Sequence, residues 1–356
     1  VVALNIPRRK APGAGAFGLG ILLCLFQASV TVLAPERAWE TRFGYAGALV
    51  RFFPAVDNLA LVMLLSIAVV GLAALLSARH AAREDNRLFN FSCLAILAIA
   101  GMNGVVLADD LFALYVFLEV TAVCSFILIA FDGDRDALEG VFKYIVLSAA
   151  ATTMILAAIA LLFLISGSLS FESLRAARPA PGSDPMTAAA VILLVAGLFI
   201  KSGLVPFHGW LPDAYSAAPA PTSVLLAGIV TKTTGVYTLI RLVTDVFAFS
   251  PTLEALLLVM GIVSIVVGAL AALGQGDFKR MLAYSSISQV GYIILGLGAG
   301  TVLGLAGAVF HLFNHAVFKS LLFVNAAAVE RQTGTRDMEK LGGISDKMPV
   351  TGATSV

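Results

Sequence analysis

Six ionisable side chains lie inside long apolar segments of this sequence. They are Glu119, Lys201, Lys232, His311, His315 and Lys319. One charged residue at the centre of a membrane helix costs about 2.5 to 3.5 kcal/mol, so the carboxylate and the three lysines together would cost on the order of 10 kcal/mol in lipid. We therefore expect these groups to face one another or water, where they could take up and release protons.

Two structural explanations for these side chains also remain open. The charged groups could form buried ion pairs or polar contacts between helices, or lysines near a helix end could extend to the lipid headgroups. Lys143, about two turns into its apolar segment, fits the second explanation best. Glu119 and Lys232 are each flanked by about eight largely apolar residues on both sides, which makes such an extension difficult.

His311, His315 and Lys319 recur every four residues and so share one face of a helix. An HxxxH pair could bind zinc, but no carboxylate or thiolate lies on this face, and the ammonium group opposes a cation. Imidazoles titrate near neutral pH and can relay protons. Two hydrogen-bonded histidines between helices remain the alternative.

The apolar segment that carries Lys201 contains its own break. Gly203 and Pro206 follow Lys201 closely, and proline removes a backbone donor and clashes with the preceding turn. Broken helices at membrane depth line a cavity or are covered by protein. We therefore expect Lys201 to lie beside a hydrated break.

The HGWLPD sequence follows this break. We expect Pro212 to stop any helix and Trp210 to anchor the chain at the membrane interface. His208 is either a proton uptake group or an ordinary loop residue.

The overall composition indicates which elements position these residues. Of the 356 residues, 59% are hydrophobic and 13% are charged, against about 45–50% and about 25% in soluble domains. The apolar residues form runs of about 20, which is the length of a membrane-spanning helix. The sequence therefore predicts an all-α, polytopic membrane helix bundle. Its ten expected spans cover about residues 14–34, 58–77, 89–109, 111–131, 138–166, 187–207, 223–247, 253–273, 281–300 and 301–327.

The same composition argues against several other classes of protein. The net charge is +1, without a basic stripe that could bind nucleic acid. The three cysteines are isolated in apolar runs, which is typical of packing residues rather than of a metal centre. The GxGxxG at residues 13–18 opens an apolar run instead of following a strand, so it does not indicate a dinucleotide site. No A-x-A-like cleavage site marks a signal peptide. We expect no cofactor and no metal site.

Basic residues predict how the chain is oriented in the membrane. With ten crossings, the side that carries the N-terminus has thirteen lysines and arginines near the spans, and the other side has about six. Because positive residues favour the cytoplasmic side, the N-terminal side is expected to be cytoplasmic. The thirteen are Arg8, Arg9, Lys10, Arg79, Arg83, Arg87, Arg135, Lys279, Arg280, Arg331, Arg336, Lys340 and Lys347.

Several long motifs resemble the antiporter-like membrane subunits shared by respiratory complex I, Mrp-type Na⁺/H⁺ antiporters and membrane-bound hydrogenases. These motifs are LADDLFALYVFLEV, IKSGLVPFHGWLPDAYSAAPAPTSVLLAGIVTKTTGVY, GDFKRMLAYSSISQVGY and VFHLFNHAVFKSLLF. The resemblance covers about residues 58–350. TGTRDMEKLGGI, at residues 333–344, is more similar to the Mrp and hydrogenase branches.

The resemblance implies a fold and a set of roles. The family fold has fourteen core helices with two inverted five-helix repeats and a broken helix. Residues 1–88 would be N-terminal helices and loops, 89–247 a first repeat, and 248–356 an incomplete second repeat, with VFK at 141–143 echoed by VFH at 309–311. The chain, which begins without Met and ends before the family's second broken helix, is expected to be a fragment.

The resemblance also implies the functional roles. Glu119 would pair with Lys201, and Lys232 would continue a polar axis that His311, His315 and Lys319 extend. Lys143 and His208 are further candidates for the same proton pathway.

The chain is expected to be a proton-translocating subunit of a larger complex in a prokaryotic plasma membrane. Whether it also exchanges Na⁺ for H⁺ is left open. Other membrane subunits and the lipid bilayer would be its partners. The subunit itself would not be catalytic, although its complex could be an NADH:quinone oxidoreductase or a hydrogenase. A secondary carrier for a small solute is the alternative. An intramembrane enzyme is disfavoured because the sequence contains no GxSxG or HExxH.

Overall fold

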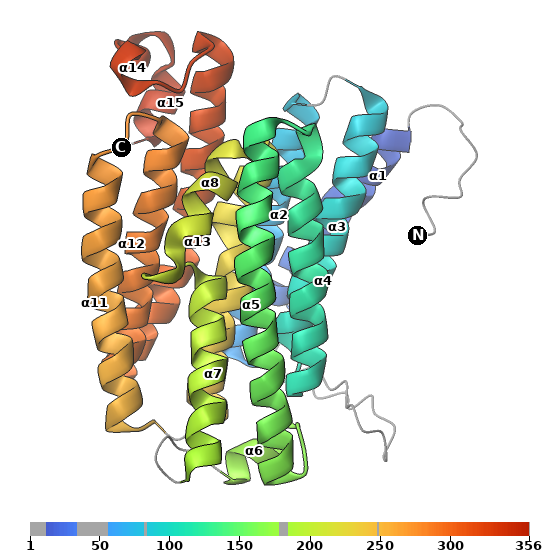
Figure 1. The fold of residues 1–356 in the computed structure, drawn as a ribbon. Helices are drawn as coiled ribbons and strands as arrows, with labels where there is room; N and C mark the ends of the chain where they lie inside the picture. The colour runs from blue at the N-terminus through green and yellow to red at the C-terminus, as the bar shows by residue number, and fades with distance from the viewer. Residues whose placement is uncertain (1–11, 34–55, 82–83, 178–183, 248, 356) are drawn as a thin grey trace.

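The computed structural model describes residues 12–33, 56–81, 84–177, 184–247 and 249–355. Within these ranges the chain forms a bundle of long helices that run roughly parallel to one another (Figure 1). Ten helical segments are long and apolar enough to cross a membrane, which confirms the predicted number for the described residues. Outside these ranges lie Arg8, Arg9, Lys10 and Arg83, which contributed to the predicted orientation.

The first half of the bundle contains six spans and one short helix. The helices are α1 (Pro12–Leu33), α2 (Asn58–Ala81), α3 (Asp85–Leu107), α4 (Leu111–Ile129), α5 (Arg135–Ser166), the short α6 (Phe171–Ala177), and α7 (Pro185–Ser202) with α8 (Trp210–Ala217), which together make the sixth span. The predicted sixth span ended at residue 207, but the structure continues it to Ala217.

The second half contains four spans. The seventh is α9 (Ala220–Leu225), two π-helical segments (Leu226–Val230 and Lys232–Tyr237) and α10 (Thr238–Asp245). The others are α11 (Pro251–Leu273), α12 (Phe278–Gly298) and α13 (Val302–Thr333), followed by the short α14 (Ile344–Lys347) and α15 (Pro349–Thr354).

Local sequence sets where many of the helices begin. A side-chain oxygen before the first turn accepts hydrogen bonds from backbone N–H groups that have no partner inside the helix. Asp110 does this for α4, Ser250 for α11, Asp277 for α12 and Thr301 for α13. These capping residues lie just before the apolar runs. Each of them therefore marks both the start of a membrane segment and the start of its helix.

The seventh span is the centre of the bundle, because its apolar stretch is buried along its whole length. It packs against α2, α3, α4, α7 and α13. Gly228 brings it close to α13, since a Cβ atom at this position would lie 2.2 Å from Ser320 Oγ and 2.6 Å from Val70 Cγ1. The span that carries Lys232 is therefore shielded from lipid by its neighbours.

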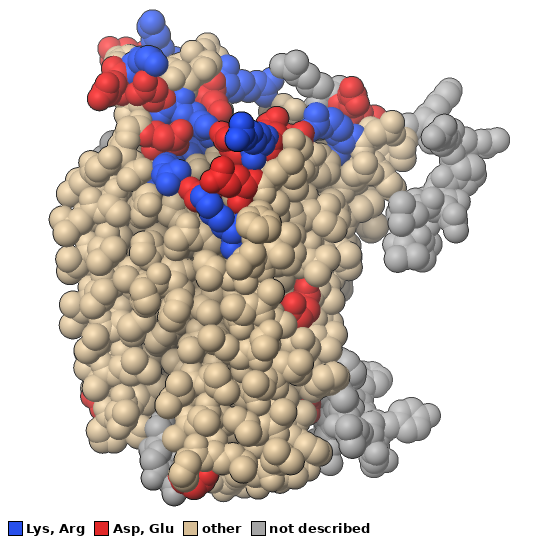
Figure 2. All heavy atoms as spheres, in the orientation of Figure 1, with Lys and Arg blue, Asp and Glu red and all other residues tan. Residues whose placement is uncertain are grey.

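The charged side chains gather mainly at one end of the bundle, which we call the charged end (Figure 2). This is the end where α8 meets the start of α12 and where α14 lies (Figure 1). The long sides of the bundle in this view are almost entirely uncharged. This distribution is that of a multi-pass integral membrane protein.

Candidate functional site

Glu119 and Lys201 form an ion pair between α4 and α7. Lys201 lies in the last turn of α7, and its Nζ is 3.1 Å from Oε1 of Glu119 on α4. The Lys201 side chain is 4% exposed and the Glu119 side chain is 32% exposed. Because Lys201 is almost completely enclosed, its charge depends strongly on this one carboxylate.

A threonine on α5 completes this contact. Thr152 donates its hydroxyl hydrogen to Oε1 of Glu119, with 2.6 Å between the oxygens. Its Oγ1 also lies 3.5 Å from Nζ of Lys201, which donates to it. The three side chains therefore form a closed triangle in which one carboxylate oxygen accepts from both a hydroxyl and an ammonium group.

The helix break lies directly after Lys201, as predicted. Gly203 ends α7 with a φ of +69°, a conformation that favours glycine. The N–H of Val205, inside the break, donates to Ser264 Oγ on α11 at 3.1 Å. Protein therefore satisfies a backbone donor that the break exposes.

The structure corrects two predictions for the residues after the break. Pro212 does not stop the helix, because it lies in the first turn of α8, where proline is tolerated. Trp210 is not an interface anchor, because it is only 1% exposed. Its ring stacks on Tyr144 of α5 at 4.1 Å between centroids, and its Nε1 donates to the carbonyl of Ile200 at 3.1 Å.

Lys143 and His208 lie between the Glu119–Lys201 pair and the charged end of the bundle. Lys143 Nζ lies 2.6 Å from Asp213 of α8 and 2.7 Å from Glu139. Asp213 also pairs with Arg280 of α12 at 2.9 Å, so it links helices from both halves of the bundle. His208 lies in a 3₁₀ turn (Phe207–Gly209), with its ring 6.5 Å from that of Tyr284.

Lys232 is fully buried at the start of the second π-helical segment. Its Nζ donates to the carbonyl of Ala227, five residues earlier. π-Helical turns change the regular pairing of backbone groups and are frequent at functional sites. Tyr215 of α8 binds the same span, through Leu226 O at 3.0 Å and Thr231 Oγ1 at 2.8 Å.

The three polar residues of α13 lie in line, as their spacing predicts. Lys319 donates to Leu282 O at 3.1 Å and to Ser285 Oγ at 2.5 Å, both on α12. His315 is fully buried, and its ring lies parallel to that of His311, with centroids 6.0 Å apart. Within the described part of the chain, neither ring nitrogen of His315 has a hydrogen-bond partner.

Among the described residues, the contacts of the four charged side chains form one ion pair. Glu119 contacts Lys201, whereas Lys232 and Lys319 donate to backbone carbonyls, with a serine hydroxyl added for Lys319. Carbonyl oxygens satisfy the hydrogen bonds of an ammonium group without neutralising its charge. Among the described contacts, these two lysines therefore have hydrogen-bond partners but no ion-pair partner.

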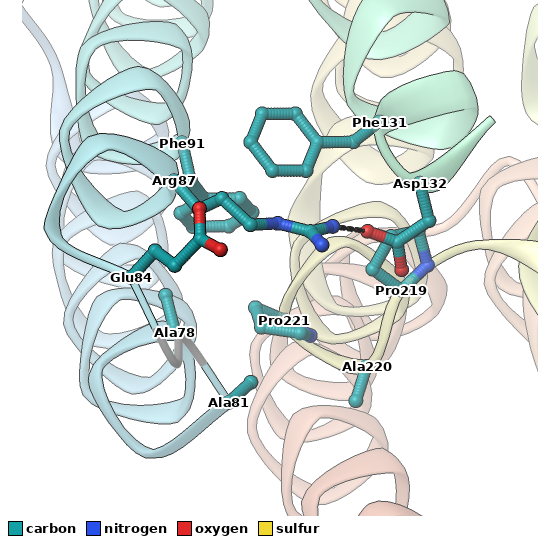
Figure 3. A pocket seen from close by; sticks show the side chains of 10 residues that line it. All are labelled: Ala78, Ala81, Glu84, Arg87, Phe91, Phe131, Asp132, Pro219, Ala220 and Pro221. Carbon is teal, nitrogen blue, oxygen red and sulfur yellow. Dashed lines mark hydrogen bonds and ion pairs between the residues drawn. The ribbon is translucent and has the colours of Figure 1, made fainter.

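At the charged end, a cavity of about 370 Å³ lies next to the start of α9, the first helix of the Lys232 span (Figure 3). Arg87 extends across it and binds Asp132, and its guanidinium lies 5.7 Å from the centroid of the Phe131 ring. Pro219 and Pro221 form the side next to α9. A second cavity of about 440 Å³ shares Asp132, Pro219 and Ala220, and it is lined by further charged residues, including Lys279, Glu330 and Arg336.

A second ion cluster holds the opposite end of the Lys232 span. Arg241 on α10 binds Asp57 through two hydrogen bonds, at 2.5 and 2.8 Å, and Asp245 at 2.9 Å. It also donates to the hydroxyl of Tyr237, which in turn donates to Val106 O of α3. This cluster fixes α10 to the start of α2 and the end of α3.

The family model for the transmembrane part of NADH:quinone oxidoreductase and Mrp antiporter subunits matches residues 108–355. The chain belongs to this family. Among curated relatives, it is 40% identical over 301 residues to an NADH-quinone oxidoreductase membrane subunit of Desulforudis audaxviator, covering 83% of this chain and 60% of the relative. It is 34% identical over 327 residues to a Na⁺/H⁺ antiporter subunit of Alkalihalophilus pseudofirmus, covering 91% of this chain and 64% of the relative.

Two solved membrane complexes contain chains with the same fold as this family member. The membrane-bound sulfane sulfur reductase, an archaeal respiratory complex, matches with a TM-score of 0.84 and 30% identity, covering 95% of this chain and 71% of that one. The Mrp complex of Dietzia sp. matches with a TM-score of 0.85 and 25% identity, covering 96% and 65%. The chain thus spans about 60 to 64% of the length of the two curated relatives.

Sequence reasoning missed several residues of this antiporter-like site. Thr152, Tyr144 and the Arg241–Asp57 pair carry no recognisable motif, because their contacts join segments that are far apart in the sequence. The π-helical turns around Lys232 are also unpredicted. A Thr-rich run with Gly228 and Gly235 was the only available signal.

Proposed function

We propose that the chain is a proton-translocating membrane subunit of a larger complex, of the type found in complex I and Mrp antiporters. The observation that carries this proposal is the Glu119–Lys201 ion pair, in which an enclosed lysine lies directly before a helix break. The family membership supports it.

The pair offers a simple way to move a proton. Burial disfavours the charged form of a lysine, and a close carboxylate favours it. When Glu119 lies close to Lys201, the ammonium form is held, and when they separate, Lys201 releases its proton. The long, flexible side chain of Lys201 allows such a movement while the backbone of α7 stays in place.

The remaining polar residues would carry the proton further through the membrane. Lys232 lies on the central span, and Lys319, His315 and His311 lie on α13. Lys143 and His208, toward the charged end, are candidates for the uptake side. The charges therefore extend from α4 to α13 instead of surrounding one pocket, which favours a proton pathway over a carrier site for a small solute.

We propose that another membrane subunit covers the face of α4 that carries Glu119. This carboxylate is 32% exposed in the middle of a span, where contact with lipid would be costly. Exposed apolar side chains continue the same face above and below it: Phe112, Val116, Val123 and Ile127. In this proposal the complex lies in a prokaryotic plasma membrane, with the charged end in the cytoplasm.

The test is proton translocation by the assembled complex in proteoliposomes, measured with a pH-sensitive dye. Glu119→Gln should remove most translocation and leave assembly intact, because the amide keeps the shape but cannot change the charge of Lys201. Lys143→Ala should have a smaller effect. Normal translocation by Glu119→Gln would contradict the proposal, and solute uptake without proton movement would favour the carrier. Repeating the assay with and without Na⁺ decides whether sodium is exchanged.

A further inference from the structure

We propose that Thr152 is a positioning residue for the Glu119–Lys201 pair, which holds the Glu119 carboxylate in place while the Lys201 side chain moves toward it and away from it. This inference rests on the proposed function, because it assigns a role within the same site. It concerns a residue of α5 that neither the charges nor the helix break would single out.

The first argument is the unusual direction of the Thr152 hydroxyl. Threonine in a helix commonly donates to the carbonyl of the preceding turn. Thr153, the next residue, does so, with its Oγ1 2.9 Å from Ala149 O. Thr152 instead donates to Glu119 Oε1 on the neighbouring helix at 2.6 Å.

The second argument is that both donors use the same oxygen atom. Oε1 of Glu119 accepts from Thr152 at 2.6 Å and from Lys201 at 3.1 Å. The short, branched side chain of Thr152 has few allowed rotamers, whereas Lys201 has a long, flexible side chain. The carboxylate therefore keeps the Thr152 donor when Lys201 moves away from it.

The other groups that face Glu119 do not replace this donor. Lys201 approaches from α7, and the phenol rings of Tyr115 on α4 and Tyr144 on α5 are close enough to interact electrostatically. These groups are unchanged when only the Thr152 hydroxyl is removed. A change in the infrared band of the Glu119 carboxylate in such a variant can therefore be assigned to Thr152.

The experiment compares three variants in the full complex. Thr152→Val removes the hydroxyl at nearly constant volume, Thr152→Ser keeps it, and Thr153→Val is the matched control on the outward side of α5. We expect Thr152→Val to lower the rate of proton translocation about tenfold, the size of one lost hydrogen bond to a charged group. Thr152→Ser and Thr153→Val should translocate protons at the wild-type rate.

A second readout does not depend on transport. Infrared difference spectra, with Glu119→Gln as the reference, report the carboxylate stretching band of Glu119. This band should shift in Thr152→Val, which loses the hydrogen bond, and should keep its position in Thr152→Ser. If Glu119→Gln leaves transport intact, the proposed function fails, but the infrared band still tests the Thr152 contact.

Two results would overturn the inference. One is a wild-type rate of proton translocation and an unshifted carboxylate band in Thr152→Val. The other is an equal loss in Thr152→Val and Thr152→Ser, which would indicate a role in packing and not in donating a hydrogen bond. If Thr152→Val does not assemble, Thr152→Ala provides the same comparison.

Discussion

Trp210 donates its indole N–H to the carbonyl oxygen of Ile200, the residue immediately before Lys201, at 3.1 Å. The same ring stacks on Tyr144 of α5, with 9° between the planes. Trp210 therefore connects the helix after the break to the helix before it, and both to α5. This connection fixes the backbone from which the Lys201 side chain extends.

Trp210→Phe is expected to weaken this connection. The Ile200 carbonyl would keep the N–H of Gly203 as a donor, so the loss should be about 1 kcal/mol of stability, the net value of one hydrogen bond. We expect a lower unfolding temperature in detergent and reduced proton translocation. Tyr144→Phe, which keeps the ring, is the matched control. Equal unfolding temperatures for Trp210→Phe and the wild type would show that the N–H contact is not needed.

The sequence allowed the membrane spans and the charged residues to be predicted, because both depend on local composition. Runs of apolar residues define the spans. A charged residue inside such a run is costly in lipid, whichever helices lie next to it. Gly203 and Pro206 likewise located the break, because they act on the backbone of their own segment.

Contacts between distant segments could not be predicted in this way. Nothing in the sequence distinguishes Thr152 from Thr153, yet one binds Glu119 and the other its own helix. Trp210 was expected at the membrane interface because tryptophan favours it, but tertiary packing covers the ring. The role of each residue was fixed by its neighbours in space.

Gly228→Ala is expected to destabilise the packing of the central span on α13. The added methyl group would lie 2.2 Å from Ser320 Oγ and 2.6 Å from Val70 Cγ1, so the helices must move apart, at a cost of about 1 to 3 kcal/mol. Gly307→Ala is the matched control, because its added methyl group would point into open space. Thermal unfolding in detergent measures both variants. Equal unfolding temperatures would mean that the Gly228 contact is easily relieved.

Asp57 should make stability depend on pH. Burial alone would raise the pKa of this carboxyl group, but the hydrogen bonds and charge of Arg241 and the N–H of Ala60 bring it below its usual value. A lowered pKa in the folded state means that the contribution is present above the unfolded pKa of about 3.9 and is lost as the pH falls through the folded value.

Asp57→Asn should therefore lower stability at pH 7, by about 1 kcal/mol after allowance for solvent screening of a half-exposed carboxylate. The difference from the wild type should begin to shrink below about pH 4, where the carboxyl group of the unfolded chain becomes protonated, and should be lost as the pH falls through the lower folded pKa of Asp57. Thermal unfolding at several pH values measures this, with Asp346→Asn, an exposed position on α14, as the control. A difference that does not change with pH would argue against the Asp57–Arg241 pair as its source.

Lys201→Arg separates a proton carrier from a structural ion pair. Arginine keeps the positive charge and can bind the Glu119 carboxylate through two hydrogen bonds, so a purely structural pair should tolerate it. It does not lose its proton at any accessible pH, so a proton carrier should fail. We expect the complex to assemble and proton translocation in proteoliposomes to be lost. Assembly with normal translocation would refute the carrier mechanism, because a permanently charged side chain would then be sufficient at this position.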